Sequence, residues 1–132
     1  MSPFKKYRHI LFEGYSTAES LQEFTLSLYN GATTRFRADR LSNYDAEHFR
    51  IFTELAASYH ANREEDEDFM AVCREMWAQR KQWGREHLAE VEKHRMIDPS
   101  AYEGGEREWR EQMEWLNKTT LRHREMGWIE EG

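Results

Sequence analysis

Residues 66–95 read DEDFMAVCREMWAQRKQWGREHLAEVEKHR, a stretch of the chain that contains no proline. Projected at ~100° per residue, its large apolar side chains fall on one broad side of a helix. They are Phe69, Val72, Cys73, Met76, Trp77, Trp83, Leu88 and Val91. The pattern predicts one long central helix against which the other helices pack. Gly84 is its weakest interior position, because glycine costs a helix ~1 kcal/mol relative to alanine.

A cationic seam runs through the second half of this apolar side. Arg80, His87 and His94 lie within ~20° of its centre. A buried arginine or histidine needs a partner, because leaving it unpaired away from water is costly. We therefore expect either that this half of the helix is partly solvated or that carboxylates from another helix meet the seam.

The rest of the chain predicts further helices, so that the fold class is all-α. We expect a small bundle of four main helices organised around the long central helix, which spans about 66–95. The other three span about 16–30, 45–61 and 106–126. Ser16 and Glu19 have the spacing of a capping box at the first of these helices. Asp45 is the expected N-cap of the second.

The two ends of the chain lie outside these helices. Residues 1–15 are expected to form an N-terminal arm, in which Tyr7 to Phe12 reads either as a minor strand or as a helical turn. Gly127 ends the last helix, and residues 127–132 are expected to form a C-terminal tail. A length of 132 residues predicts a single helical domain that spans 1–132.

The composition excludes several classes of protein. The net charge of -6 argues against direct, general binding of nucleic acid. The single cysteine, Cys73, excludes an internal disulfide and a cysteine-rich zinc site. We see no signal peptide and no apolar run long enough to span a bilayer. We therefore expect a cytoplasmic protein with no membrane partner.

His87, Glu90 and His94 form the best candidate for a chemical site. Their spacings of three and four residues place them on one helical face, which suits a divalent metal. The alternative, that the two histidines are satisfied structural or surface residues, is favoured. No cofactor is expected otherwise. The sequence shows no Ser-His-Asp signature and no glycine-rich phosphate loop, so we predict that the protein is not an enzyme.

Protein contact is indicated by the abundance of Trp, Tyr, Met and Arg, which are enriched in interfaces. The candidate contact residues near the C-terminus are Trp115, Arg122, Arg124 and Trp128. They could equally be ordinary core and rim residues. A second candidate is the acidic run Glu64, Glu65, Asp66, Glu67 and Asp68, as a surface that mimics nucleic acid. The favoured alternative is that these acids interact with the dipole of the following helix.

Three segments of the first half carry a family resemblance. They are GYSTAESLQEFTLSLYNG (14–31), LSNYDAEHF (41–49) and REEDEDFM (63–70). Together they resemble a family of small, uncharacterised proteins encoded on bacterial conjugative elements, plasmids and phage-derived islands. The shared motifs are structural and carry no catalytic residues. The resemblance implies a genomic context in which small acidic proteins often bind and block CRISPR or restriction machinery.

The leading hypothesis is a non-enzymatic protein-binding factor of a mobile genetic element, specifically an anti-CRISPR or anti-restriction inhibitor. It would act on another protein, or on a protein–nucleic acid complex, by steric block or by acidic mimicry of nucleic acid. Two alternatives stay open. One is a helical metal-binding protein that uses His87, Glu90 and His94. The other is a self-associating structural or regulatory protein, for which a homodimer is the simplest form.

Overall fold

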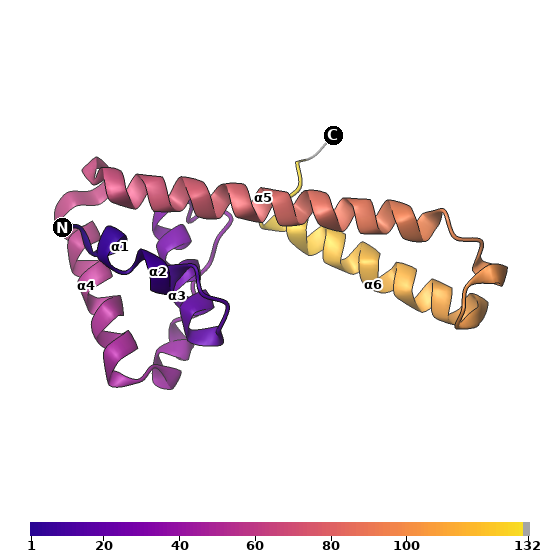
Figure 1. Cartoon of the computed structure of the whole chain (residues 1–132), viewed down its shortest axis with the longest axis horizontal. Helices are drawn as coiled ribbons and strands as arrows, with labels where there is room; N and C mark the ends of the chain where they lie inside the picture. Colours follow the sequence, from indigo (N-terminus) through magenta and orange to yellow (C-terminus); the bar gives the residue numbers. More distant parts are fainter. Residues whose placement is uncertain (131–132) are drawn as a thin grey trace. The chain divides into compact units, whose positions relative to one another are not determined.

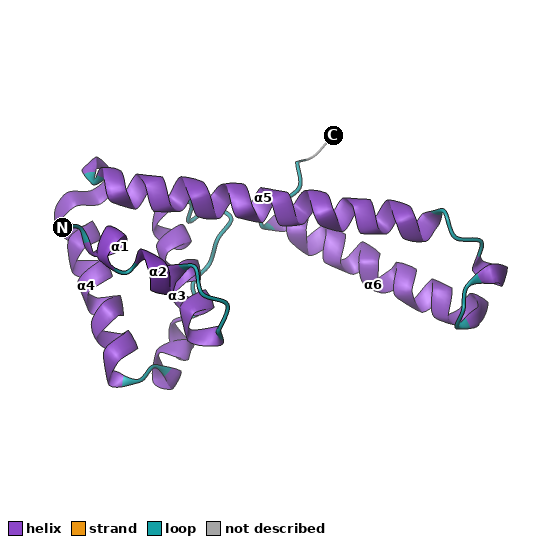
Figure 2. Cartoon of the chain, in the orientation of Figure 1, coloured by secondary structure: helices purple, strands orange, loops and turns teal. Residues whose placement is uncertain are grey.

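The computed structural model describes residues 1–130, and every regular element among them is a helix (Figure 1; Figure 2). The α-helices are α1 (Pro3–Lys6), α2 (Arg8–Leu11), α3 (Ser16–Tyr29), α4 (Ala46–Asn62), α5 (Glu67–Arg95) and α6 (Gly105–Glu125). Three short 3-10 helices are η1 (Ala38–Asn43), η2 (Arg63–Glu65) and η3 (Pro99–Ala101). The predicted all-α fold is confirmed. The minor N-terminal strand is wrong, because that part of the described chain forms helical turns.

The described chain divides into two compact units. The N-terminal unit is Met1–Trp77 and contains α1 to α4 and the beginning of α5. The C-terminal unit begins at Ala78 and contains the rest of α5, together with η3 and α6. Helix α5 is one uninterrupted helix of 29 residues, and Gly84 does not break it. The single domain expected from the sequence stays a prediction, since compact packing does not by itself report independent folding.

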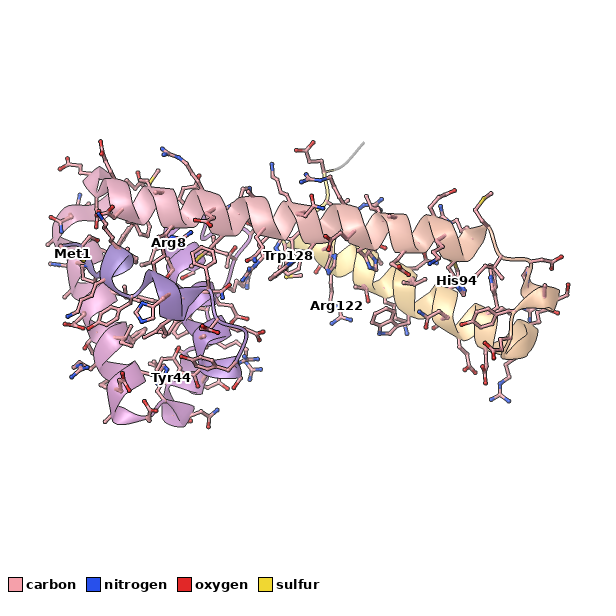
Figure 3. The ribbon with its side chains drawn as sticks, in the orientation of Figure 1. Met1, Arg8, Tyr44, His94, Arg122 and Trp128 are labelled. Carbon is pink, nitrogen blue, oxygen red and sulfur yellow. The ribbon has the colours of Figure 1, made fainter. Side chains whose placement is uncertain are left out.

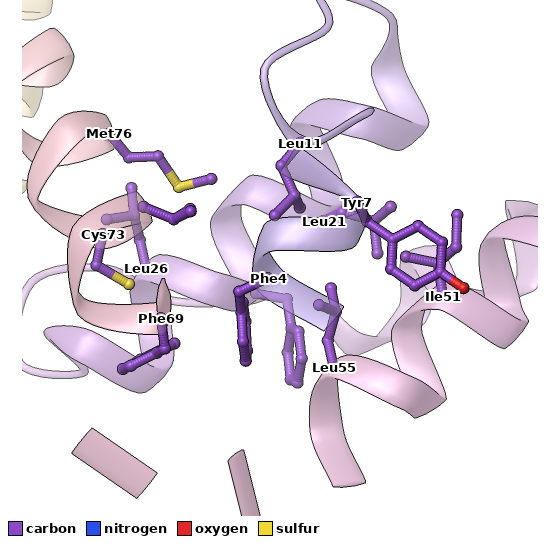
Figure 4. Close-up of a cluster of buried hydrophobic side chains, with 12 residues drawn as sticks. Phe4, Tyr7, Leu11, Leu21, Leu26, Ile51, Leu55, Phe69, Cys73 and Met76 are labelled. Atoms are coloured by element: carbon purple, nitrogen blue, oxygen red, sulfur yellow. The ribbon is translucent and has the colours of Figure 1, made fainter. Parts of the chain in front are cut away.

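The N-terminal unit has a large apolar core (Figure 4). Near its centre, the rings of Phe4 and Phe69 meet edge to face, with their centroids 4.9 Å apart. Its buried members are Phe4, Tyr7, Leu11, Leu21, Phe24, Leu26, Ile51, Leu55, Phe69, Val72, Cys73 and Met76. The first half of the predicted apolar side of α5 is therefore buried here against residues of α1 to α4.

Residues 3–11, expected as part of an N-terminal arm, contribute to this core. Phe4, Tyr7 and Leu11 are buried, and they recur three and four residues apart, so that helical turns bring them to one face. The Ser2 hydroxyl accepts a hydrogen bond from the backbone N–H of Phe4, and Pro3 begins α1. Both are favourable at a helix start, because Ser satisfies a free N–H and Pro lacks one.

The starts of α3 and α4 are capped differently. The predicted capping box of Ser16 and Glu19 is wrong, because Ser16 is already the first helical residue and Tyr15, the N-cap, makes no side-chain cap bond. The N-cap of α4 is confirmed, since the Asp45 carboxylate accepts the His48 backbone N–H at 2.8 Å. The pKa of Asp45 lies below its ordinary value because of its hydrogen bonds from the backbone and the ring of His48.

The C-terminal unit is a pair of helices, with α6 returning alongside the second half of α5 (Figure 1). Its buried hydrophobic residues are few: Val91, Leu116 and Ile129. Arg80, His94 and Thr120 are buried among them. Gly127, with a φ of 77°, ends α6, and the segment after it returns to α5. The predicted tail thus packs on this unit as far as residue 130.

Candidate functional site

The interface of α5 and α6 contains the polar seam that the sequence predicted. His87 Nε2 lies 2.9 Å from the hydroxyl oxygen of Thr120 and 3.2 Å from the backbone oxygen of Leu116. The Thr120 hydroxyl donates to the same Leu116 oxygen at 2.8 Å. Because that hydroxyl proton is already used, Thr120 accepts from His87, which fixes the ring proton on Nε2. His87 therefore joins the two helices through α6 groups alone.

His94, the penultimate residue of α5, is satisfied in a similar way. Its Nε2 donates to the backbone oxygen of Trp109 at 2.9 Å, and its ring stacks on the Trp109 indole with centroids 5.0 Å apart. In Figure 3, the labelled His94 lies between α5 and α6. The ring of Tyr102 contacts its other side edge to face, at 5.2 Å. The histidine is thus enclosed by aromatic rings and bonded to a carbonyl.

Arg80 completes the seam with aromatic partners. Its guanidinium lies 4.6 Å from the ring centroid of Trp83 and 5.7 Å from that of Trp128. Gln79 also accepts a long hydrogen bond from it, at 3.5 Å. For His87 and His94, the partners from α6 are hydroxyl, carbonyl and ring groups rather than carboxylates. The Arg80 guanidinium gains favourable contacts with the faces of the two indole rings.

His123 of α6 faces this seam from the other helix. Its ring centroid lies 4.8 Å from that of His87 and 4.7 Å from that of Trp128. Burial lowers the pKa of His123, and the nearby charges of His87 and Arg122 lower it further. Its Nδ1 is buried without a hydrogen-bond partner among the described residues. Both effects favour the neutral ring, because a proton added here would be poorly solvated.

The proposed metal ligands are not brought together. His87 and His94 make the α6 bonds described above, whereas Glu90 is exposed on α5. Within residues 1–130, no three His, Cys, Asp or Glu side chains are grouped so that they could hold a metal ion. The geometry thus favours the structural interpretation of the two histidines. Their spacing places them on one face of α5, but their Nε2 atoms are hydrogen-bonded to groups of α6.

The candidate contact residues near the C-terminus divide into three environments. Trp115 is 53 % exposed, and Arg122, seven residues further, lies on the same flank of α6. Figure 3 shows the labelled Arg122 extending from α6 on the side away from α5. Arg124 instead lines a groove between the two helices. Trp128 is half-buried against Trp83 and His123, so it belongs to the packing of this unit.

The acidic run has one clear structural role. The Asp66 carboxylate accepts the backbone N–H groups of Asp68 and Phe69, which caps the start of α5. It also accepts a 2.6 Å hydrogen bond from the Ser2 hydroxyl, so it ties the N-terminus to this helix. The remaining acids include exposed side chains, at Glu64, Glu65 and Glu67. The run therefore combines a helix cap with an acidic surface.

Cys73 lies inside the core of the N-terminal unit. Burial raises the pKa of its thiol from 9.0 to about 12, so the thiolate that reacts as a nucleophile is disfavoured. Its Sγ lies 3.9 Å from the backbone oxygen of Thr25. The residue therefore packs as a small apolar side chain, as the sequence predicted.

A groove between α5 and α6 was missed from the sequence. It has a volume of about 400 Å³ and is lined by Leu88, Val91, Glu92, Arg95, Asn117, Thr120, Leu121 and Arg124. Leu121 is 58 % exposed and Leu88 is 38 % exposed. The available signal was the spacing of Leu121 from Leu116, since five residues place the two side chains ~140° apart around their helix. A large apolar residue there belongs neither to the internal interface nor to an ordinary polar surface.

No protein-family model, curated protein or solved structure matches this chain. None of the described helices combines the length and the apolar character needed to cross a membrane.

Proposed function

We propose that this chain is a non-enzymatic protein-binding factor, whose contact surface is the flank of α6 that carries Trp115 and Arg122. The observation that carries the proposal is the state of the Trp115 indole. It is 53 % exposed, and no hydrogen bond or ring contact holds it within residues 1–130. The other tryptophans of this unit, Trp83, Trp109 and Trp128, all have aromatic partners.

The physical argument concerns the gain available on binding. A tryptophan side chain buries up to ~250 Å². Covering the exposed half of Trp115 would therefore contribute ~3 kcal/mol at ~25 cal/mol per Å². Arg122 beside it is always charged and donates in a planar fork. Together they suit a partner surface that offers an apolar socket beside a carboxylate, a combination typical of interface hot spots.

We propose further that the partner is a component of bacterial CRISPR or restriction machinery, and that binding blocks it sterically. The resemblance of segments 14–31, 41–49 and 63–70 to proteins of mobile elements supports this choice of partner. The exposed Glu64, Glu65 and Glu67 support an acidic surface that occupies a site for nucleic acid. Because these systems act in the bacterial cytoplasm, we propose that the protein acts there as well.

The test is affinity capture with the tagged full chain in lysates of bacteria that carry CRISPR and restriction systems. We expect a defence complex to be recovered with the wild type and at least tenfold less of it with Trp115→Ala or Arg122→Glu. Phe49→Ala is the matched control, because Phe49 is a similarly exposed aromatic residue, at 47 %, on α4. Recovery of no defence or nucleic-acid-processing complex would contradict the choice of partner. Equal recovery with Trp115→Ala would contradict the surface.

A further inference from the structure

The groove between α5 and α6 differs from the Trp115 flank in position and in chemistry. Its floor is formed by Val91 and Thr120, which are buried at 5 % and 8 % exposure. Above the floor, Leu88 and Leu121 rise from opposite helices and remain exposed. Leu121 lies six residues after Trp115, which places the two side chains ~120° apart around α6. The groove is therefore a separate apolar surface.

Because the core of the C-terminal unit is small, covering this groove would add to the stability of the unit. Two helices side by side can bury only one stripe each, and Val91, Leu116 and Ile129 are the buried hydrophobic residues of this unit up to residue 130. Helix pairs of this kind gain their stability when a second layer covers the open face, as in a four-helix bundle. The open face here carries the two leucines that such a layer would bury.

We propose that the groove is covered by a second copy of this chain, so that two α5–α6 pairs form a four-helix bundle. The surface is self-complementary. The exposed Leu121 of one copy would fit into the space between Leu88, Val91 and Thr120 of the other, in the manner of knobs-into-holes packing. An isologous contact needs this kind of self-complementary patch, and a two-fold dimer is the simplest assembly that closes.

The charges around the groove are compatible with the binding of a second copy. Glu92 and Arg95 lie on α5 and pair at 3.8 Å, and Arg124 lies on α6 without an ion pair among the described residues. The groove thus carries both signs of charge. A uniformly acidic or basic partner would be repelled by one of these groups, whereas a second copy presents both signs and allows pairing.

The available area is sufficient for a weak but specific dimer. Residues 78–95 of α5 span ~27 Å at 1.5 Å per residue. Two helices packed ~9 Å apart present a face ~18 Å wide. The face is therefore ~500 Å² per copy, or ~1,000 Å² in total, which reaches the lower range of specific interfaces. An area of this size predicts a dimer that dissociates on dilution.

The test is sedimentation velocity of the full chain over a series of concentrations from about 1 µM to about 500 µM, which covers the dissociation constants of weak dimers. We expect the mass to rise from the monomer value of 16.0 kDa to twice that value. Leu121→Lys should weaken self-association at least tenfold. Trp115→Lys is the matched control, since Trp115 is equally exposed on the other flank, and it should leave the association unchanged.

Cysteine cross-linking tests the same contact without relying on the folding of Leu121→Lys. Asn117→Cys places an exposed thiol in the groove, whereas the native Cys73 stays buried. Mild oxidation should give a disulfide-linked dimer of Asn117→Cys, and Lys118→Cys, one residue outside the groove, should form at least tenfold less linked dimer.

A wild type that stays monomeric throughout the concentration series overturns the proposal. Equal weakening by the Trp115 and Leu121 variants, or equal linkage at 117 and 118, overturns it as well. The inference does not rest on the proposed function.

Discussion

His94 and Trp109 exchange two hydrogen bonds. His94 Nε2 donates to the backbone oxygen of Trp109 at 2.9 Å, and the Trp109 indole N–H donates to the backbone oxygen of His94 at 3.1 Å. The His94 carbonyl belongs to the last turn of α5 and also accepts the backbone N–H of Ile97 at 3.1 Å. The indole is therefore a second donor to this oxygen, supplied by α6 as an additional cap for α5. The two hydrogen bonds hold α5 and α6 together near the segment that connects them.

The first prediction concerns the indole N–H of this pair. Trp109→Phe keeps an aromatic ring for stacking on His94 but removes the donor, so we expect a loss of ~1 kcal/mol in the free energy of unfolding. Trp109→Ala removes the ring as well and should cost ~2 kcal/mol or more. Thermal and urea unfolding followed by circular dichroism measure both. If Trp109→Phe were as stable as the wild type, the capping role of the indole would be refuted.

The second prediction concerns Phe4, which lies in the segment that was expected to form an N-terminal arm. Its side chain is fully buried, so Phe4→Ala should lower the free energy of unfolding of the N-terminal unit by ~3 kcal/mol or more. Hydrogen exchange in α3 and α4 should become faster accordingly. The neighbouring Lys5 is exposed, and Lys5→Ala is the control that should leave exchange unchanged. Wild-type exchange in Phe4→Ala would show that residues 1–15 are dispensable for the core.

The third prediction concerns Gly84, whose role is steric rather than conformational. A Cβ at this position would lie 2.4 Å from the backbone oxygen of Trp128 and 3.1 Å from Cγ1 of Ile129. Gly84→Ala should raise helix propensity by ~1 kcal/mol, yet displace the segment that carries these two residues. We therefore expect no gain in the thermal midpoint and faster proteolysis after Gly127.

A truncated chain separates these two effects of Gly84→Ala. In a chain that ends at Gly127, the clash is absent, so the same substitution should raise the thermal midpoint. An increase in the thermal midpoint of the full chain, without faster proteolysis, would mean that the C-terminal segment does not pack on Gly84.

The fourth prediction concerns pH and His123. Its pKa is lowered in the folded chain by burial, by His87 and by Arg122, from the ordinary value of 6.5. Between the folded value and 6.5, the unfolded chain binds more protons, so the free energy of unfolding falls as pH drops through 6.5. The loss levels off below the folded-state pKa. His123→Gln removes this titration and should flatten the dependence.

Thermal midpoints between about pH 7.5 and about pH 5 measure the effect, since histidine titrates in this range. The exposed His60 on α4 provides the control, and His60→Gln should keep the wild-type dependence. The same slope in His123→Gln and in the wild type would assign the acid sensitivity to other groups.

Much of the local structure was predictable from the sequence. The spacing of Phe69, Val72, Cys73 and Met76 predicted both the helix and its buried side. Asp45 was expected as an N-cap, and it accepts the backbone N–H three residues later. These features depend on residues within about one helical turn, so that their geometry follows from the backbone alone.

The candidate site was only partly predictable. The sequence singled out Arg80, His87 and His94 as a seam that needs partners, and it singled out Trp115 and Trp128 as contact residues. It did not separate the exposed Trp115 from the packed Trp128. Spacing gives the direction of a side chain around its own helix, but not which other surface covers that direction.

The sequence by itself determined that the chain is helical, where the main helices run and which residues form the apolar side of α5. Tertiary structure alone decided that α6 carbonyls and indole rings, rather than carboxylates or a metal, satisfy the buried histidines. It also decided that Phe4 is a core residue and that Leu121 is left exposed. The physical reason is range: helix formation depends on neighbours in sequence, whereas burial and hydrogen-bond partners depend on which surfaces meet after folding.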